Sequence, residues 1–202
     1  ELKAFRSDRA FPVDVDGRAL RDYFAVGYVP DSASIYRVAR KLPPAHYLLV
    51  RGDACVFEEP KPYWRFEFRP DTSVSADEWQ ERLEQKLTET VACHMISDVP
   101  LGAFLSGGVD SSTVVALMAR ASSRPVKTFS IGFEEEAYSE LPHARAVAQH
   151  TGADHTDIIV RPDKCALVEK LFSFYDEPFA DSSALPTFLV SELARTQVTV
   201  CL

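Results

Sequence analysis

The chain has 202 residues, 46% of them hydrophobic, which is enough to bury a core in one large domain or two small ones. Its formal charge of -8 would repel a phosphate backbone, so the composition argues against a nucleic-acid partner. No apolar run approaches the roughly 18 to 20 residues that a membrane span needs, and the four cysteines have neither disulfide nor zinc-site spacing. We therefore expect a cytoplasmic protein with free, buried thiols and no membrane contact.

The first 70 or so residues are rich in aromatic side chains and proline. Asp16 and Gly27 are suited to begin and end a helix over residues 16–26. HYLLV (46–50) and ACVFEE (54–59) flank the turn residues RGD and predict a hairpin. The pattern changes at FRPDTSVS (68–75), so we expect one domain over residues 1–72 and a second over residues 76–202.

The second half shows helix and strand patterns in alternation. Apolar residues at every fourth position predict a long amphipathic helix over residues 76–97: Trp79, Leu83, Leu87, Val91 and Met95. Strands are expected at 99–105, 126–132, 155–160 and 197–202, and helices at 111–121, 139–152, 162–175 and 185–194. Such repeated units predict an α/β fold, with a parallel sheet and flanking helices. Ligands of these folds bind at the carboxyl ends of the strands, where residues 106–111 fall.

The segment FLSGGVDSS (104–112) joins a buried strand to an apolar helix. Gly107 and Gly108 allow a tight turn that presents N–H groups to an anion, and a helix starting near Ser111 adds the positive end of its dipole. Asp110 would repel a phosphate by itself, so its expected role is to bind Mg²⁺. The loop lacks the GK[ST] of a Walker A motif. The alternative is a turn that needs glycine for its shape alone, with Ser111 as an ordinary cap.

These residues carry a family resemblance. LSGGVDSS resembles the SGGxDS loop of the PP-loop ATP pyrophosphatases. Three segments, residues 99–112, TFSIGFEEEAYSE (128–140) and YDEPFADSSALPT (175–187), resemble the synthetase domain of glutamine-hydrolysing asparagine synthetases. Residues 1–5, 22–50 and 62–66 are similar to the closing part of that family's N-terminal glutaminase domain, a β-rich remnant of an N-terminal-nucleophile fold. The resemblance covers nearly the whole chain, in the family's order.

The resemblance implies a site for ATP and Mg²⁺. The residues that would bind pyrophosphate are Ser106, Gly107, Gly108, Asp110 and Ser111, with Ser112 assisting at the helix start. Asp110 would also bind the metal, and Asp110 and Ser111 would be the catalytic residues. Leu105 and Ile131, at the ends of adjacent strands, would flank the adenine, the alternative being ordinary core packing. A further set would bind the amino-acid substrate or line the approach of ammonia, the alternative being capping and solvation: Asp176, Glu177 and Asp181.

The remaining polar groups have plainer interpretations. The five histidines show no metal spacing, so we expect surface or helix residues and not ligands. The acidic run at 134–136 is interpreted as a solvated loop.

The implied activity is that of a ligase. Aspartate would attack the α-phosphate of ATP to give β-aspartyl-AMP and pyrophosphate, and glutamine-derived ammonia would then displace AMP. The family's amino-terminal nucleophilic cysteine and its second acidic, glycine-rich loop have no counterpart here, so we expect a piece of a longer protein that is inactive alone. A homodimer is an open possibility. Two alternatives stay open: a related enzyme with another acceptor (β-lactam-forming, carbohydrate- or peptide-modifying, or tRNA-thiolating), and a noncatalytic nucleotide-binding module.

Overall fold

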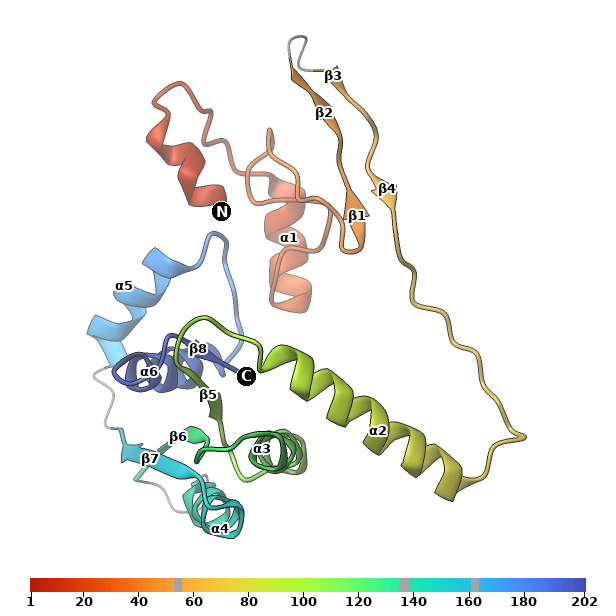
Figure 1. The fold of residues 1–202 in the computed structure, drawn as a ribbon. Helices are drawn as coiled ribbons and strands as arrows, with labels where there is room; N and C mark the ends of the chain where they lie inside the picture. Colours follow the sequence, from red (N-terminus) through yellow and green to blue (C-terminus); the bar gives the residue numbers. More distant parts are fainter. Residues whose placement is uncertain (53–55, 135–138, 161–163) are drawn as a thin grey trace. The chain divides into compact units, whose positions relative to one another are not determined.

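A computed structural model describes residues 1–52, 56–134, 139–160 and 164–202. The chain forms two compact units. The first contains Glu1–Pro70 and Val168–Ser182, and the second contains Asp71–Leu167 and Ser183–Leu202. Figure 1 follows the chain through its elements in sequence order. Among the described residues, no helix is both long enough and apolar enough to cross a membrane.

The first unit opens with a 3-10 helix, η1 (Leu2–Ser7), which the sequence pattern did not predict. Helix α1 (Gly17–Val26) confirms the helix expected over residues 16–26. The Asp16 carboxylate accepts a hydrogen bond of 2.8 Å from the Arg18 N–H, and Gly27 ends the helix with φ at 85°. Ala19 packs against two residues beyond the helix, Val29 and Ile35, to form a small core.

The predicted hairpin is confirmed and is longer than expected. Strand β1 (His46–Tyr47) pairs antiparallel with β4 (Lys61–Pro62), and β2 (Val50–Arg51) pairs antiparallel with β3 (Val56–Phe57). Residues 53–55, which include the last residue of the predicted RGD turn and Cys55, lie outside the described residues. Since two-stranded pairs bury little on their own, these strands leave apolar side chains such as Leu49 and Val50 exposed.

The second unit is built on a parallel sheet, as predicted. Its strands are β5 (Leu101–Phe104), β6 (Lys127–Gly132), β7 (Asp154–Ile159) and β8 (Val200–Cys201), in the order β7-β6-β5-β8. Helices α3 (Val109–Ala121), α4 (Leu141–Thr151) and α6 (Ala184–Arg195) belong to this unit. Helix α5 (Lys164–Phe174) follows β7 in the chain, and its residues from Val168 onward belong to the first unit. The α/β fold with flanking helices is therefore confirmed.

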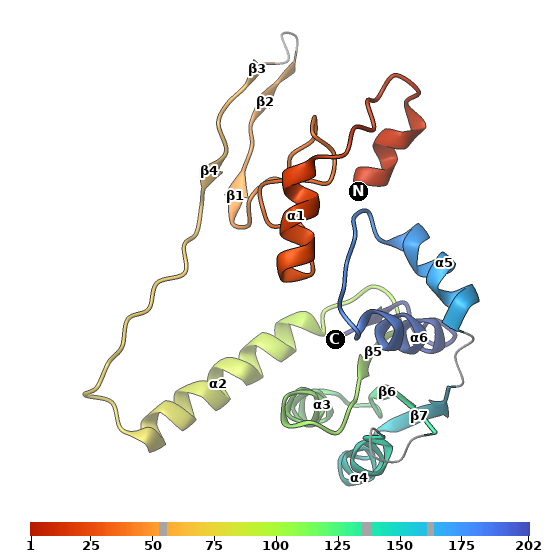
Figure 2. The same ribbon diagram turned by 180° about the vertical axis from the view of Figure 1, so that it is seen from behind.

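Helices cover both faces of this sheet. Ala103 and Leu105 pack into one cluster with Val115 of α3 and Ala144 of α4. Phe129, which is fully buried, packs into a second cluster with side chains of α6. Figure 2 shows α3 and α4 side by side, with α6 apart from them. Successive strand residues point to opposite faces of the sheet. The side chains of β5 and β6 are therefore divided between these two cores.

Helix α2 (Ala76–His94) begins at Ser75, whose hydroxyl accepts a hydrogen bond of 3.2 Å from the Glu78 N–H. The predicted stripe is only half buried. Val91 lies in the core with Leu87 and Met95 packed around it, whereas Trp79 and Leu83 are 45% and 59% exposed. The core of the unit thus reaches only the C-terminal half of α2.

The unit boundary at Pro70 and Asp71 lies beside the predicted domain boundary. The expected second domain covers residues 76–202, but the second compact unit does not include all of them. Val168–Ser182 belongs to the first unit. The assignment of the two units to a glutaminase domain and a synthetase domain stays a prediction.

Candidate active site

The segment from Leu105 to Gly108 leaves the carboxyl end of β5 and leads directly into α3. Leu105 is anchored in the sheet, because its N–H donates to the carbonyl of Phe129 at 2.9 Å and its side chain is 1% exposed. The loop therefore stands at the edge of the sheet where parallel α/β folds bind ligands.

The two glycines of the loop differ in what they require. Gly107 has φ at 86°, in the region that favours glycine. A Cβ at Gly107 would lie 2.6 Å from both the backbone nitrogen of Ala144 and the Cβ of His143, at the start of α4. Gly108 has an ordinary φ of -69°, and a Cβ there would lie 3.3 Å from the Ser106 hydroxyl. The close approach of backbone to backbone thus depends on Gly107.

Serine hydroxyls hold the loop in shape. Ser106 Oγ lies 2.9 Å from Ser111 Oγ and accepts a hydrogen bond of 3.2 Å from the Gly108 N–H. Ser111 Oγ also accepts from the Ser106 N–H at 3.2 Å. Two of these bonds join Ser106 to Ser111 in the first turn of α3 and the third lies within the loop, so the loop is ordered by its own side chains.

Helix α3 begins at Val109, two residues earlier than predicted, with Gly108 as the N-cap. The first intrahelical bond is made by Ser112, whose N–H donates to the Gly108 carbonyl at 3.0 Å. The N–H groups of Val109, Asp110 and Ser111 precede it and have no partner within the helix. These donors and the positive end of the helix dipole favour an anion at this place.

Two side chains of this first turn bear on ligand binding. Asp110 is exposed, so its carboxylate is accessible to a cation. The Ser112 hydroxyl is buried and has no hydrogen-bond partner among the described residues. No group of three or more metal-binding side chains occurs within the described part of the chain. Asp110 alone still fits Mg²⁺, because this ion is commonly bound by one or two carboxylates together with phosphate oxygens and water.

A cavity of about 280 Å³ lies beside the loop within the second unit. Three of the predicted residues line it, Leu105, Ser106 and Ile131. The other lining residues were not predicted from the sequence: Phe104, Phe129, Ser130, Phe133, Glu140, Leu141, Ala144, Pro186, Thr187 and Val190. The strand ends could have indicated part of this set, because Phe104 and Phe133 flank strand ends as Leu105 does. Nothing local to the sequence marks Pro186, Thr187 or Val190 of α6 as cavity residues.

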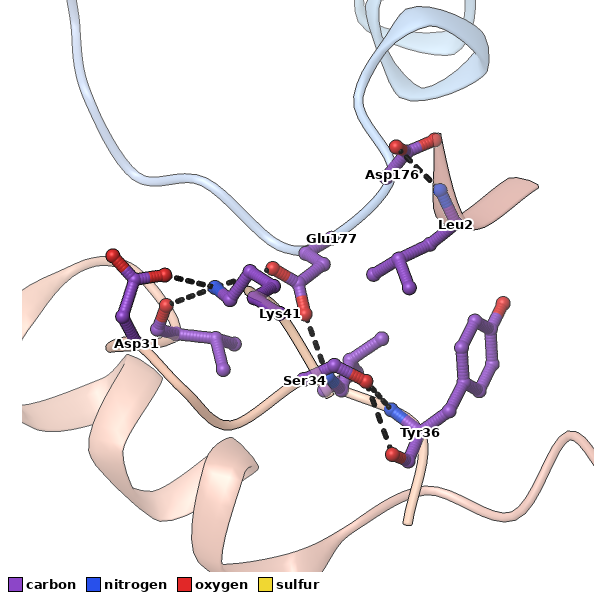
Figure 3. Close-up of polar contacts among 9 residues, drawn as sticks. Leu2, Asp31, Ser34, Tyr36, Lys41, Asp176 and Glu177 are labelled. Carbon is purple, nitrogen blue, oxygen red and sulfur yellow. Dashed lines mark hydrogen bonds and ion pairs between the residues drawn. The ribbon is translucent and has the colours of Figure 1, made fainter. Parts of the chain in front are cut away.

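The three predicted acidic substrate residues belong to the first unit. Figure 3 shows Asp176 and Glu177 with their hydrogen-bond partners. The Asp176 carboxylate accepts hydrogen bonds from the backbone N–H groups of Leu2 and Lys3. Glu177 accepts from the Ile35 N–H and from the Lys41 ammonium. Asp181 belongs to the same unit and also interacts with other residues. The structure thus gives the first two carboxylates partners within the chain, and a substrate role for the three residues stays a prediction.

One histidine differs from its expected place on the surface. His155 lies in β7 with a side chain only 10% exposed, and its Nδ1 is 2.9 Å from the Thr128 hydroxyl. Burial lowers the pKa of His155, although the neighbouring Asp157 opposes this effect. The Arg145 guanidinium donates two hydrogen bonds to Asp157 and holds the pKa of that carboxyl below its usual value. These groups do not line the cavity.

The thiols match the prediction in part. Cys93 and Cys201 are free, as expected, but Cys93 is exposed, so the expectation of buried thiols is wrong for it. Cys93 lies near the end of α2, on the side that the core does not cover. Cys201 is partly buried, and burial raises the pKa of its thiol.

The second unit is an α/β domain in which a loop, with N–H donors that have no partner within α3, lies at the carboxyl edge of a parallel sheet beside a cavity. This is the edge where folds of this class bind ligands. The chain belongs to the asparagine synthase family: the family described as "Asparagine synthase" matches residues 82–202.

Similar proteins extend this match to the first unit. The chain is 31% identical over 191 residues to asparagine synthetase [glutamine-hydrolyzing] 1 of Bacillus subtilis, covering 94% of this chain and 30% of that protein. It is 38% identical over 193 residues to putative asparagine synthetase [glutamine-hydrolyzing] 2 of Methanocaldococcus jannaschii, covering 94% and 36%. The structure of NMN synthetase from Francisella tularensis aligns with a TM-score of 0.41 at 16% identity, covering 63% of this chain and 53% of that one. The chain thus spans about a third of the length of the curated relatives it matches.

Proposed function

We propose that the protein is a glutamine-hydrolysing asparagine synthetase, of which the second unit contributes the ATP pyrophosphatase loop. The observation that carries the proposal is the placement of this loop. Unused N–H groups of α3 and the Asp110 carboxylate lie at the carboxyl edge of the sheet, beside a cavity lined by Leu105 and Ile131. Membership of the asparagine synthase family supports the choice of aspartate and ATP as substrates.

In this proposal, the side-chain carboxylate of aspartate attacks the α-phosphorus of ATP. A new oxygen–phosphorus bond forms as the bond to pyrophosphate breaks, giving β-aspartyl-AMP. Ammonia then attacks the activated carbonyl carbon, and AMP leaves as asparagine forms. The chain's own contribution is to place and stabilise the leaving pyrophosphate, on which negative charge builds up.

Each part of the loop has a role in that step. The N–H groups of Val109, Asp110 and Ser111 donate to pyrophosphate oxygens, while the Ser106 and Ser111 hydroxyls keep the loop in register with the helix. Asp110 would hold Mg²⁺, and the ion, when bound, neutralises charge on the phosphates. The apolar walls of the cavity exclude water from the adenine.

The first unit would contribute the closing part of the glutaminase domain, which supplies ammonia. This assignment depends on relatives that are named as glutamine-hydrolysing and that match 94% of the chain. A homodimer stays an open expectation.

The experiment is aspartate-dependent exchange of pyrophosphate into ATP, measured in the full-length protein. Asp110→Asn keeps the shape of the side chain and removes its charge, so the exchange rate should fall at least about 100-fold, while hydrolysis of glutamine continues. Asp98→Asn is the matched control, because Asp98 is also exposed, and it should leave the exchange unchanged.

Two results would count against the proposal. An exchange rate near that of the wild type in folded Asp110→Asn would remove the metal–pyrophosphate role of the loop. Exchange that requires a different carboxylate acceptor would keep the pyrophosphatase assignment and reject aspartate as the substrate.

A further inference from the structure

The segment 174–180 is hydrogen-bonded to the beginning of the chain through a carboxylate side chain that accepts from backbone N–H groups. Asp176 Oδ2 accepts from the Leu2 N–H at 2.8 Å, and Oδ1 accepts from the Lys3 N–H at 3.1 Å. These are the first two N–H groups of η1, whose own N-cap residue, Glu1, makes no side-chain cap. Lys3 Nζ in turn donates a hydrogen bond of 2.7 Å to the carbonyl of Phe174. A residue 174 positions away therefore caps η1.

Glu177 makes a second attachment (Figure 3). Its Oε1 accepts from the Ile35 N–H at 2.6 Å, and its Oε2 accepts from Lys41 Nζ at 2.9 Å. Lys41 Nζ also donates to the carbonyl of Val29 at 2.5 Å. The Glu177 side chain is only 15% exposed, so its charge depends on these partners for compensation. Ile35 and Val29 belong to the core of the first unit, which fixes the place of Glu177.

A third attachment follows three residues later, where the Ala180 N–H donates to the carbonyl of Gly27 at 2.8 Å. We call Asp176 and Glu177, with their four hydrogen bonds, the carboxylate clasp. The clasp and the Ala180 bond together fix the backbone of segment 174–180 against the first unit.

The chain enters the second unit immediately after this segment. Only Asp181 and Ser182 separate Ala180 from Ser183, the residue before α6. The first two turns of α6 carry Pro186, Thr187 and Val190, which line the cavity beside the loop. The covalent path from the clasp to the cavity wall is therefore a few residues long.

We propose that Asp176 and Glu177 are positioning residues that couple the first unit to the ATP cavity. They fix the segment that leads into α6, so a change in the first unit is transmitted to the wall formed by Pro186, Thr187 and Val190. The inference rests on the proposed function, in which the first unit belongs to the half that supplies ammonia. Its consequence is that the clasp links the supply of ammonia to the use of ATP.

The test uses the full-length protein and the variants Asp176→Asn and Glu177→Gln, which keep side-chain size and remove charge. The matched control is Glu169→Gln, because Glu169 is an exposed carboxylate of α5 that also belongs to the first unit and lies outside the clasp. Two quantities are measured: the KM for ATP with ammonia as nitrogen donor, and the asparagine formed per glutamine hydrolysed.

We expect the KM for ATP to rise about 2- to 30-fold in both variants, the range typical of coupling residues. The yield of asparagine per glutamine should fall in both, while the rate of glutamine hydrolysis and the KM for aspartate stay at the wild-type values. Glu169→Gln should match the wild type. Lys41→Met removes the ammonium group that pairs with Glu177 and should raise the KM for ATP in the same way. This variant tests the same ion pair if Glu177→Gln fails to fold.

Three outcomes would overturn the inference. A raised KM for aspartate with an unchanged KM for ATP would make the carboxylates substrate ligands. A lower melting temperature with unchanged kinetic constants would make the clasp a purely structural contact. A wild-type protein without ATP–pyrophosphate exchange would reject the proposed function itself, and this failure is recognisable because it precedes any substitution in the clasp.

Discussion

Replacing Gly107 by alanine should destabilise the second unit more than any other single methyl group added to its loop. The backbone of Gly107 has φ at 86°, and the added Cβ would lie 2.6 Å from the Ala144 nitrogen and from the His143 Cβ. Both neighbours belong to the first turn of α4, which cannot yield as the end of a flexible side chain would.

The expected cost has two parts. The left-handed conformation of a residue with a Cβ costs roughly 1 to 2 kcal/mol. Forcing a methyl group into a closely packed site costs roughly 1 to 3 kcal/mol more. The free energy of unfolding should therefore fall by about 2 to 5 kcal/mol in Gly107→Ala.

Two matched variants separate these parts. Gly152 has φ at 66° and open space around its missing Cβ, so Gly152→Ala should show the conformational part alone, about 1 to 2 kcal/mol. Gly108 has an ordinary φ, and the nearest atom to an added Cβ is the Ser106 hydroxyl at 3.3 Å, so Gly108→Ala should change stability by less than about 1 kcal/mol.

Urea denaturation of the full-length protein measures all three values, provided that the slopes of the unfolding curves agree. A midpoint for Gly107→Ala within error of Gly152→Ala would refute the packing argument. An equal decrease in the free energy of unfolding in Gly107→Ala and Gly108→Ala would refute the claim that Gly107 is the strained position.

His155 should make stability depend on pH. Burial keeps its pKa in the folded protein below the usual 6.5, so at low pH the unfolded chain binds more protons than the folded chain. The free energy of unfolding should decrease as the pH falls below about 6.5. His155→Gln, which can still bond the Thr128 hydroxyl, should weaken this pH dependence when urea denaturation is measured at several pH values. The same change of unfolding free energy with pH in this variant and in the wild type would contradict the burial argument. In the native protein, Cys93 should react with a thiol reagent faster than Cys201, because Cys93 is exposed and burial raises the pKa of Cys201. Mass spectrometry of the modified peptides gives the order, and earlier labelling of Cys201 would contradict it.

The loop could be predicted because its signals are local. Gly107, Gly108 and Asp110 are close in sequence, so their place between a strand and a helix follows from the neighbouring residues alone. The same holds for the ends of the helices. Asp16 caps α1 as it was expected to, because a cap needs only the side chain and the next two or three N–H groups.

Alternation of strands and helices also determined the parallel sheet, since a crossover connection leaves few ways to arrange such units. The amphipathic stripe of α2 was determined less well. Its period gives the face of the helix, but not how far along that face the core extends, and Trp79 and Leu83 lie beyond it.

Only the tertiary structure decided which glycine is strained, because the close approach is between Gly107, in the loop, and Ala144, in α4, which are 37 positions apart in the chain. It also decided the partners of Asp176 and Glu177, which bond to Leu2 and Ile35 over separations of 174 and 142 residues. A carboxylate close to a helix end predicts capping or ligand binding equally well from sequence. The physical reason is that a hydrogen bond depends on position in space, and residues distant in the chain become neighbours only when the fold is complete.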